Sequence, residues 1–289
     1  MLYKINVLLK GDFGNQLFIY TASNKIKQIN NNRYYLRFYQ LSKFIWSEKS
    51  KFLNLYTILR DEIIYINLPR IFEEILYFFK FYLFRLIIRD NSKIKIFSDK
   101  QITLNGYFQK KKWYENEWKN TVKFIFKNLN KDFKIKNYPI VVSLAMGETN
   151  IINKRILKFD YYLRALKILK IRENDDIYVL GQYTNEMLKN FIIFLKKNNY
   201  RKIIILNDKK KLSLYNKSIL DFITIAKSNK LIMSNSTFCW WASVSRFHYN
   251  LQSKNVVAPK KWRKKKLGNF GNPHSPKKIN WQFINNQIN

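Results

Sequence analysis

The sequence has little cysteine and no long uninterrupted apolar run. Its one cysteine, Cys239, excludes an internal disulfide and a cysteine-based metal cluster, and it suits a reducing compartment. The most apolar segment, residues 71–88, is interrupted by charged residues such as Glu73 and Lys80. These charges exclude a membrane-spanning helix in that segment, because a charged side chain is costly inside a bilayer.

Acidic residues are scarce beside basic ones. The chain has 54 Lys and Arg against 19 Asp and Glu, which gives a formal net charge of +35. Such a charge attracts nucleic acid, anionic lipid and phosphorylated substrates alike. The basic residues are spread along the chain among Asn and Ile, and no Arg/Gly-rich tail, zinc-knuckle spacing or RNP-type aromatic motif occurs. We therefore interpret the charge as a compositional bias and do not expect nucleic acid as a partner.

The N-terminal stretch lacks the features of a secretory signal. It carries Lys4 and Lys10 and has no longer apolar core followed by a small-residue cleavage site. We therefore expect a cytoplasmic protein. Farther along, apolar residues recur at helical spacing over residues 71–86, which indicates a core helix. The neighbouring Lys80 and Arg85 leave open a helix on the inner face of the membrane.

Hydrophobic residues make up 47% of the chain, which is ample material for a packed interior, and the length suits two domains. Residues 3–9 predict a buried strand, Gly11 and Gly14 open a turn, and a helix begins near Asn15. From there to about residue 100 the pattern is mostly helical. Later strands are predicted at 140–144, 177–180, 202–206, 230–233 and 255–258, and helices at 161–169, 185–197 and 236–246. This alternation predicts a parallel sheet with crossover helices on both faces.

A polar link near residues 130–138 separates the two predicted domains, which we place at 1–135 and 136–289. In parallel sheets of this kind, ligands bind beyond the carboxyl ends of the strands. We therefore expect a ligand-binding site in the loops that follow the predicted strands.

The first candidate loop begins at Gly11 and reads Gly-Asp-Phe-Gly-Asn-Gln-Leu-Phe-Ile-Tyr-Thr-Ala. Glycines let backbone amides approach a ligand, and the positive end of the following helix favours an anion. The same glycines would serve turn geometry alone in many strand-to-helix connections. The spacing by itself leaves both interpretations open.

The second candidate segment follows the strand predicted at 230–233 and reads Ser-Asn-Ser-Thr-Phe-Cys-Trp-Trp-Ala-Ser from Ser234. Ser236 or Thr237 suits the N-cap of a helix, and a diphosphate would fit at such a strand end. Trp240 and Trp241 cannot share one helix face. We expect one of them in the core and the other toward a neighbouring domain or a ligand.

Together these segments resemble the glycosyltransferase family 11 α-1,2-fucosyltransferases. The first loop of that family is typically Gly-Gly-Leu-Gly-Asn-Gln-Leu/Met-Phe-Gln-Tyr-Ala, and its late motif is Ser-Asn-Ser-Ser-Phe-Ser-Trp-Trp-Ala. The similarity extends to residues 106–109 with Trp113 and Tyr114, and to residues 256–262. The matches occur in the order of the family and span nearly the whole chain.

The resemblance implies an α/β GT-B-like fold with two Rossmann-like domains facing a cleft. The N-terminal domain would be on the acceptor side, and the C-terminal domain would bind the nucleotide-sugar. The implied reaction is an inverting, metal-independent transfer of fucose or a related sugar from a nucleotide diphosphate, GDP-fucose first, in surface polysaccharide or lipopolysaccharide synthesis. The acceptor would be a hydroxyl of a glycan or lipid-linked glycan, and the donor is a substrate, so we expect no cofactor.

The same resemblance assigns the candidate binding residues. The residues expected to shape the cleft are Gly11, Gly14, Asn15 and Gln16. The residues expected beside the donor diphosphate are Ser234, Asn235, Ser236, Thr237 and Phe238. Trp240 and Trp241 match structural positions, and His248 and His274 match no family position and are interpreted as surface residues.

One family motif is altered in this chain. The family has His-x-Arg-Arg-Gly-Asp on the first strand of the donor domain, where residues 143–148 read Ser-Leu-Ala-Met-Gly-Glu. An arginine of that motif stabilises the negative charge on the departing diphosphate, which Ala145 and Met146 cannot do. The family also holds the guanine with the motif histidine and a downstream Ser-Asp-Asp. Ser143 and Gln182 stand at these places and are not equivalents.

Three outcomes stay open. The chain uses a different nucleotide-sugar, or a nearby cation, Lys154 or Arg155, replaces the arginine, or the chain is a non-catalytic glycan- or nucleotide-binding relative. Among the cations Arg155 is our catalytic candidate. Glu148 stands at the family's aspartate and would either accept the proton of the acceptor hydroxyl or cap the following turn.

Overall fold

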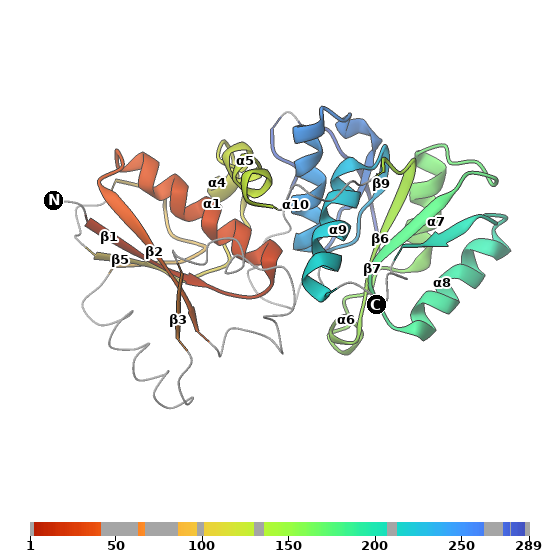
Figure 1. Ribbon diagram of the computed structural model, residues 1–289, viewed down its shortest axis with the longest axis horizontal. Coiled ribbons are helices and arrows are strands. Elements are labelled where there is room, and N and C mark those ends of the chain that lie inside the picture. Colours follow the sequence, from red (N-terminus) through yellow and green to blue (C-terminus); the bar gives the residue numbers. More distant parts are fainter. Residues whose placement is uncertain are drawn as a thin grey trace. The chain divides into compact units, whose positions relative to one another are not determined.

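The computed structural model describes residues 3–41, 63–66, 86–96, 101–129, 136–206, 213–262, 274–277 and 279–286. The chain forms two compact units, Met1–Leu129 (unit 1) and Asn130–Asn289 (unit 2) (Figure 1). Residues 130–135, which end at the boundary predicted from the sequence, lie outside the described residues.

Unit 1 is built on a parallel sheet with the strand order β3-β2-β1-β5-β4. Its strands are β1 (Tyr3–Leu9), β2 (Tyr34–Leu41), β3 (Ile63–Ile66), β4 (Leu86–Ile88) and β5 (Gln101–Leu104), and its helices are α1 (Phe13–Ile29), α4 (Lys111–Tyr114) and α5 (Trp118–Asn128). Helix α1 lies along one face of the sheet in Figure 1. The hydroxyls of Thr21 on α1 and Thr121 on α5 lie 2.8 Å apart in the interior and join the two helices.

The predicted first strand is confirmed at β1, but the mostly helical pattern predicted up to residue 100 is wrong at β2, β3 and β4. In β2, Tyr34, Phe38 and Tyr39 are fully buried, and the strand pairs in parallel with β1 along its length. Aromatic residues favour such a pleated surface, and short apolar runs without a clear period do not distinguish strand from helix. The apolar stripe at 71–86 lies outside the described residues, except that Leu86 begins β4.

Unit 2 is built on a six-stranded parallel sheet with the order β11-β10-β9-β6-β7-β8. Its strands are β6 (Ile140–Met146), β7 (Ile177–Tyr183), β8 (Ile203–Ile205), β9 (Lys230–Ile232), β10 (Val256–Pro259) and β11 (Gln282–Ile284). Its helices are α6 (Glu148–Ile152), α7 (Phe159–Ile168), α8 (Asn185–Lys197), α9 (Leu214–Lys227) and α10 (Thr237–Val244), with 3-10 turns η5 (Ser245–Tyr249) and η6 (Ser253–Asn255). In Figure 1, α7 and α8 lie on one side of the sheet, and α9 and α10 lie on the other.

Numbered within unit 2, this strand order is 3-2-1-4-5-6, the order of a Rossmann fold. The predicted α/β class and the predicted parallel sheet are therefore confirmed. Helix α8 has the predicted bounds, whereas β6 runs on to Met146 and β7 to Tyr183, and α9 and β11 were not predicted. No helix in the described part of the chain combines the length and the apolar character that crossing a bilayer requires.

The buried aromatic residues of unit 2 hold the strand ends in place. Tyr161 of α7 is 1% exposed, and its hydroxyl donates to the carbonyl of Met233 at 2.7 Å. Trp240 and Trp241 are both fully buried, with their rings 4.9 Å apart at a steep angle. Burial places both rings in the interior, and the expectation that one of them faces a ligand or a neighbouring domain stays a prediction. Trp240 also donates to the carbonyl of His274. This bond joins α10 to a residue much later in the chain.

Candidate functional site

In unit 2 the chain leaves β6 toward β7 on one side of the sheet, and it runs from β9 to β10 on the other side. The loops that follow β6 and β9 therefore diverge and leave a crevice at the topological switch point. The altered motif, residues 143–148, ends β6, and residues 234–238 follow β9. The fold thus brings together the two segments of unit 2 that the sequence singled out.

Two serines join these segments in the interior. The hydroxyls of Ser143 on β6 and Ser234 lie 3.2 Å apart, and Ser234 is fully buried. The thiol of Cys239 lies against both hydroxyls, and its burial raises the pKa of the thiol. Ser143, which stands where the resemblance has histidine, thus contacts the protein's own interior.

Asn235 joins three segments of unit 2. Its side-chain amide donates to the carbonyl of Arg155 at 2.8 Å and to the carbonyl of Trp262 at 3.2 Å. Arg155 lies in the loop after α6, and Trp262 follows β10. A single side chain at the end of β9 therefore positions the candidate cation beside residues 234–238.

The guanidinium of Arg155 has an unusual environment. The side chain is half-buried, and its Nε atom is buried without a hydrogen-bond partner among the described residues. An unpaired buried N–H of a charged group is costly unless another group satisfies it. Lys154, the other candidate cation, is exposed and adopts a left-handed φ of 51° in the turn before Arg155.

Helix α10 points its first turn into this region. Ser236 occupies the N-cap, as predicted, but its hydroxyl makes no capping hydrogen bond, and the first intrahelical bond is Trp240 N to Ser236 O. The amides of Thr237 and Phe238 belong to the first turn, which has no intrahelical acceptors for them. Ser236 and Thr237 are half-buried, so their polar groups are within reach of solvent.

Glu148 begins α6 and is exposed. The carbonyl of Gly147 accepts from the amides of Asn150 and Ile151 at 2.9 and 3.1 Å, so Gly147 closes the start of this turn. Glu148 lies one position farther along, where a carboxylate complements the positive helix end. The side chain is accessible to solvent.

Unit 1 has a switch point of its own, between β1 and β5. Gly11 follows β1 with a φ of +67°, and a Cβ at this position would lie only 2.6 Å from Asn15 Nδ2, so the turn requires glycine. Gln16 is almost fully buried and donates to the carbonyl of Gly11 at 3.0 Å, and Gly14 is buried in the first turn of α1. Asn15 accepts from the side chain of Gln109, in the loop after β5, at 2.7 Å. The four residues predicted to shape the cleft thus lie together, and Gln109 joins them.

Asp90, just after β4, is a site residue that the sequence reasoning missed. Its carboxylate accepts from the amides of Tyr107 and Phe108, and its carbonyl accepts from Trp113 Nε1 at 2.8 Å. A Cβ at Gly106 would collide with this carboxylate. Asp90 therefore shapes the loop that carries Gln109. The sequence did offer a sign of this role, because Asp90 is one of few acidic residues and closely follows an apolar run. The prediction of a helix in that region concealed the sign.

The remaining candidate groups are the potential metal ligands and the two histidines. Among the described residues, no group of three or more His, Cys, Asp or Glu is arranged to hold a metal ion. His248 and His274 are exposed, as predicted.

No protein-family model matches the sequence, and no curated protein matches it either. Solved structures with a similar fold include the fucosyltransferase NodZ from Bradyrhizobium, with a TM-score of 0.46, 10% identity, and coverage of 84% of this chain and 92% of that one. Arabidopsis thaliana FUT1 in complex with GDP has a TM-score of 0.46 and 8% identity, covering 84% of this chain and 68% of that one. E. coli heptosyltransferase WaaC with ADP-2-deoxy-2-fluoro heptose has a TM-score of 0.42 and 8% identity, covering 97% and 92%. Identities this low leave the activity to be argued from the site itself.

Proposed function

We propose that the protein is an inverting glycosyltransferase that moves fucose or a related sugar from a GDP-linked donor to a hydroxyl of a surface glycan. The observation that carries the proposal is the position of residues 234–238, at the switch point of a Rossmann sheet and beside the end of β6. The motif of these residues resembles the diphosphate segment of family 11, and parallel sheets bind ligands at such a crevice.

The donor diphosphate would lie at the start of α10. The first-turn amides of Thr237 and Phe238 have no partners within the helix and are oriented for an anion. The hydroxyls of Ser236 and Thr237 supply further donors. Ser234 and Asn235 would position the start of α10 and would not contact the diphosphate themselves. The hydroxyl of Ser234 bonds to that of Ser143, and the side-chain amide of Asn235 donates to the carbonyl of Arg155.

Arg155 would take the role of the missing motif arginine. The new glycosidic bond forms as the bond between the sugar carbon and the diphosphate oxygen breaks, and negative charge collects on the departing diphosphate. A guanidinium with an unsatisfied N–H, fixed by Asn235 beside the diphosphate segment, is suited to receive that charge.

Glu148 would accept the proton of the acceptor hydroxyl as the oxygen attacks. It is exposed, and it begins α6, the helix that follows the altered strand. A carboxylate can act as a general base when it is positioned at the proton that it removes. The sugar carbon then inverts, because the acceptor oxygen attacks from the face opposite the leaving diphosphate.

A second candidate function is favoured by Ala145 and Met146, which are buried at the end of β6. These side chains carry no charge and cannot stabilise a departing diphosphate. The alternative is therefore a protein that binds a nucleotide-sugar or a glycan without transferring the sugar.

The test is a calorimetric and thermal-shift titration of the full chain with GDP, UDP, CDP, dTDP and their sugars. A ligand that binds the folded state alone raises the apparent melting temperature. We expect GDP and GDP-fucose to give the largest shift, and Thr237→Val, which removes a hydroxyl at the diphosphate segment, to reduce it. Preference for another nucleotide would redirect the donor assignment, and no shift with any nucleotide would contradict the proposal.

Binding and activity are separated by a second measurement on the same protein. Release of GDP from GDP-fucose in the presence of a glycan library reports turnover. Binding with turnover supports the transferase, whereas GDP binding without any turnover favours the non-catalytic alternative.

A further inference from the structure

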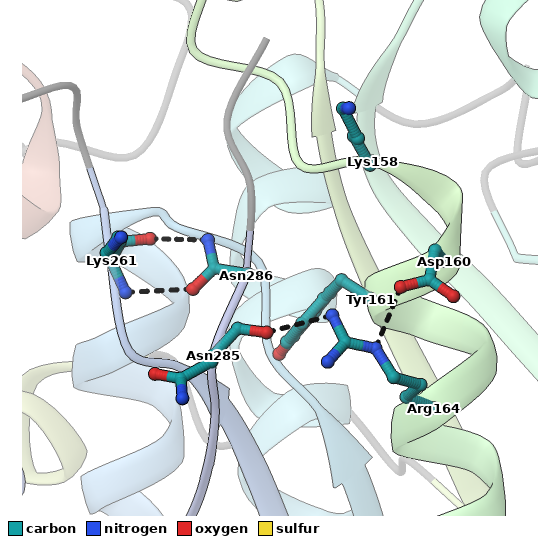
Figure 2. A pocket seen from close by; sticks show the side chains of 7 residues that line it. All are labelled: Lys158, Asp160, Tyr161, Arg164, Lys261, Asn285 and Asn286. Carbon is teal, nitrogen blue, oxygen red and sulfur yellow. Dashed lines mark hydrogen bonds and ion pairs between the residues drawn. The ribbon is translucent and has the colours of Figure 1, made fainter.

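Unit 2 has a second concave site away from the β6–β9 switch point. A pocket of about 630 Å³ opens between the start of α7 and the carboxyl ends of β10 and β11 (Figure 2). Its basic side chains are Lys158 and Arg164 from the α7 side and Lys261 from the segment after β10. The motifs recognised in the sequence do not assign a ligand to it.

The charges around this pocket are unbalanced. Asp160 is the one acid among its described lining residues, and its carboxylate pairs with Arg164 Nε at 2.8 Å. Lys158 and Lys261 line the same pocket, so its wall carries more positive than negative charge. The first turn of α7 lies at the same place, and its positive helix end adds to the field.

The pocket is held in shape by hydrogen bonds that Figure 2 shows. Asn286 is 4% exposed, and its side-chain amide accepts from Lys261 N and donates to Lys261 O, both at 2.8 Å. Arg164 Nη2 donates to the carbonyl of Asn285 at 2.8 Å. The backbone of Lys261 and the guanidinium of Arg164 are thus ordered before a ligand arrives, which lowers the cost of binding.

The pocket is linked through the chain to the proposed donor site. The carbonyl of Trp262, next to Lys261, accepts from Asn235, and Asn235 also holds Arg155. Lys158 follows Arg155 closely along the chain. A molecule in the pocket would lie over β10 and β11, whereas the proposed donor site is at the β6–β9 crevice.

We propose that this pocket binds an oxyanion, a phosphate or a carboxylate, carried by the acceptor glycan. The assignment to the acceptor rests on the proposed function, because that function places the donor diphosphate at the other strand ends. The acceptor would accordingly be an anionic glycan or a glycan attached through a phosphate, and the neutral sugars of a plain oligosaccharide would leave the charge of the pocket unused.

The test is a calorimetric titration of the full chain with inorganic phosphate and, separately, with sodium glucuronate, at constant ionic strength. The pocket variants are Lys261→Gln and Lys158→Gln. The matched control is Lys189→Gln, an exposed lysine on α8 that does not line the pocket. We expect each pocket variant to weaken binding of at least one probe by about fivefold or more, because a charge-assisted contact is lost. The control should bind as the wild type does.

The two probes distinguish phosphate from carboxylate as the preferred group. A repeat with saturating GDP separates the pocket from the donor site, and we expect the anion affinity to stay within about twofold. Equal binding by all variants, or displacement of the anion by GDP, would overturn the proposal. Anion binding that depends on Lys261 in a protein that binds no nucleotide would support the anion site and contradict the proposed function.

Discussion

Hydrogen bonds to the backbone of Arg155 fix the position of this residue. The carbonyl accepts from Asn235, and the amide donates to the carbonyl of Asn150 at 2.8 Å, so the residue is held on both sides of its Cα atom. The side chain keeps its unsatisfied Nε. This combination of a fixed backbone and a buried N–H without a partner favours Arg155 over the exposed Lys154 as the leaving-group cation.

Replacing Arg155 tests this directly. We expect Arg155→Gln to lower kcat for GDP release from GDP-fucose by about 100-fold or more, because a preorganised donor to a developing oxyanion is lost. The affinity for GDP should change much less than kcat. The control is Arg172→Gln, whose side chain is 89% exposed and faces Asp175. If Lys154→Gln lowers turnover and Arg155→Gln does not, the role belongs to Lys154.

Cys239 is a second residue whose behaviour follows from its burial. Burial raises the pKa of its thiol in the folded state, so the unfolded chain loses the thiol proton first as pH rises. The stabilisation by the neutral thiol is complete below the unfolded pKa of about 8.5, and it declines above that pH. Urea unfolding of the wild type and Cys239→Ala between pH 7 and 10 should show their stability difference narrowing with pH. A difference that is constant with pH would contradict this.

At the scale of single elements, the β1–α1 connection depends on one left-handed glycine. We expect Gly11→Ala to destabilise the fold by about 1–3 kcal/mol, because alanine adopts a positive φ at a cost and its Cβ would meet Asn15. The comparison is Gly147→Ala in unit 2, where a Cβ would make an ordinary contact of 3.5 Å with Gln182. Denaturant unfolding should rank Gly11→Ala as clearly the more destabilising change, and equal effects would refute the argument.

The η5 turn depends on a buried arginine. Arg246 is 2% exposed, and its guanidinium donates to Ser228, to the carbonyl of Asn229 at 3.0 Å and to the carbonyl of Gln252 at 3.3 Å. It thereby holds η5 against the segment that enters β9. Burial lowers the pKa of this guanidinium to about 10.

Removal of the Arg246 guanidinium should lower the stability of the folded chain. We expect Arg246→Met to lower the free energy of unfolding by about 3 kcal/mol, because several buried carbonyls lose their donors. Arg246→Lys retains the charge but not the planar fork, so it should rescue only part of the loss. Full rescue by lysine in urea titrations would show that charge alone matters.

At the scale of the whole molecule, the net charge of +35 is the dominant feature. A lipid-linked acceptor would place the protein near an anionic membrane, and a basic surface is attracted there within a Debye length. We expect co-sedimentation with phosphatidylserine vesicles at low salt, loss of that binding at about 0.5 M NaCl because of screening, and no binding to phosphatidylcholine vesicles. Equal binding to both lipids would contradict an electrostatic origin.

The sequence by itself determined the features that depend on local chemistry. Residues 3–9 are apolar enough to specify a strand, the Gly11 turn needs a residue without a Cβ, and residues 185–197 have the period of an amphipathic helix, which α8 confirms. The motif order also located the loops that line both switch points. Each of these features depends on residues that are close together in the sequence, so the sequence alone predicts it.

Tertiary structure alone decided the rest. The strands β2 and β4 exist because they pair with neighbours distant in sequence, and Trp241 is buried because other segments enclose α10. The contact of Ser143 with Ser234 and the pocket beside β11 join residues that the chain keeps far apart. Backbone pairing and burial depend on which segments meet in space, and local residue pattern carries little of that information.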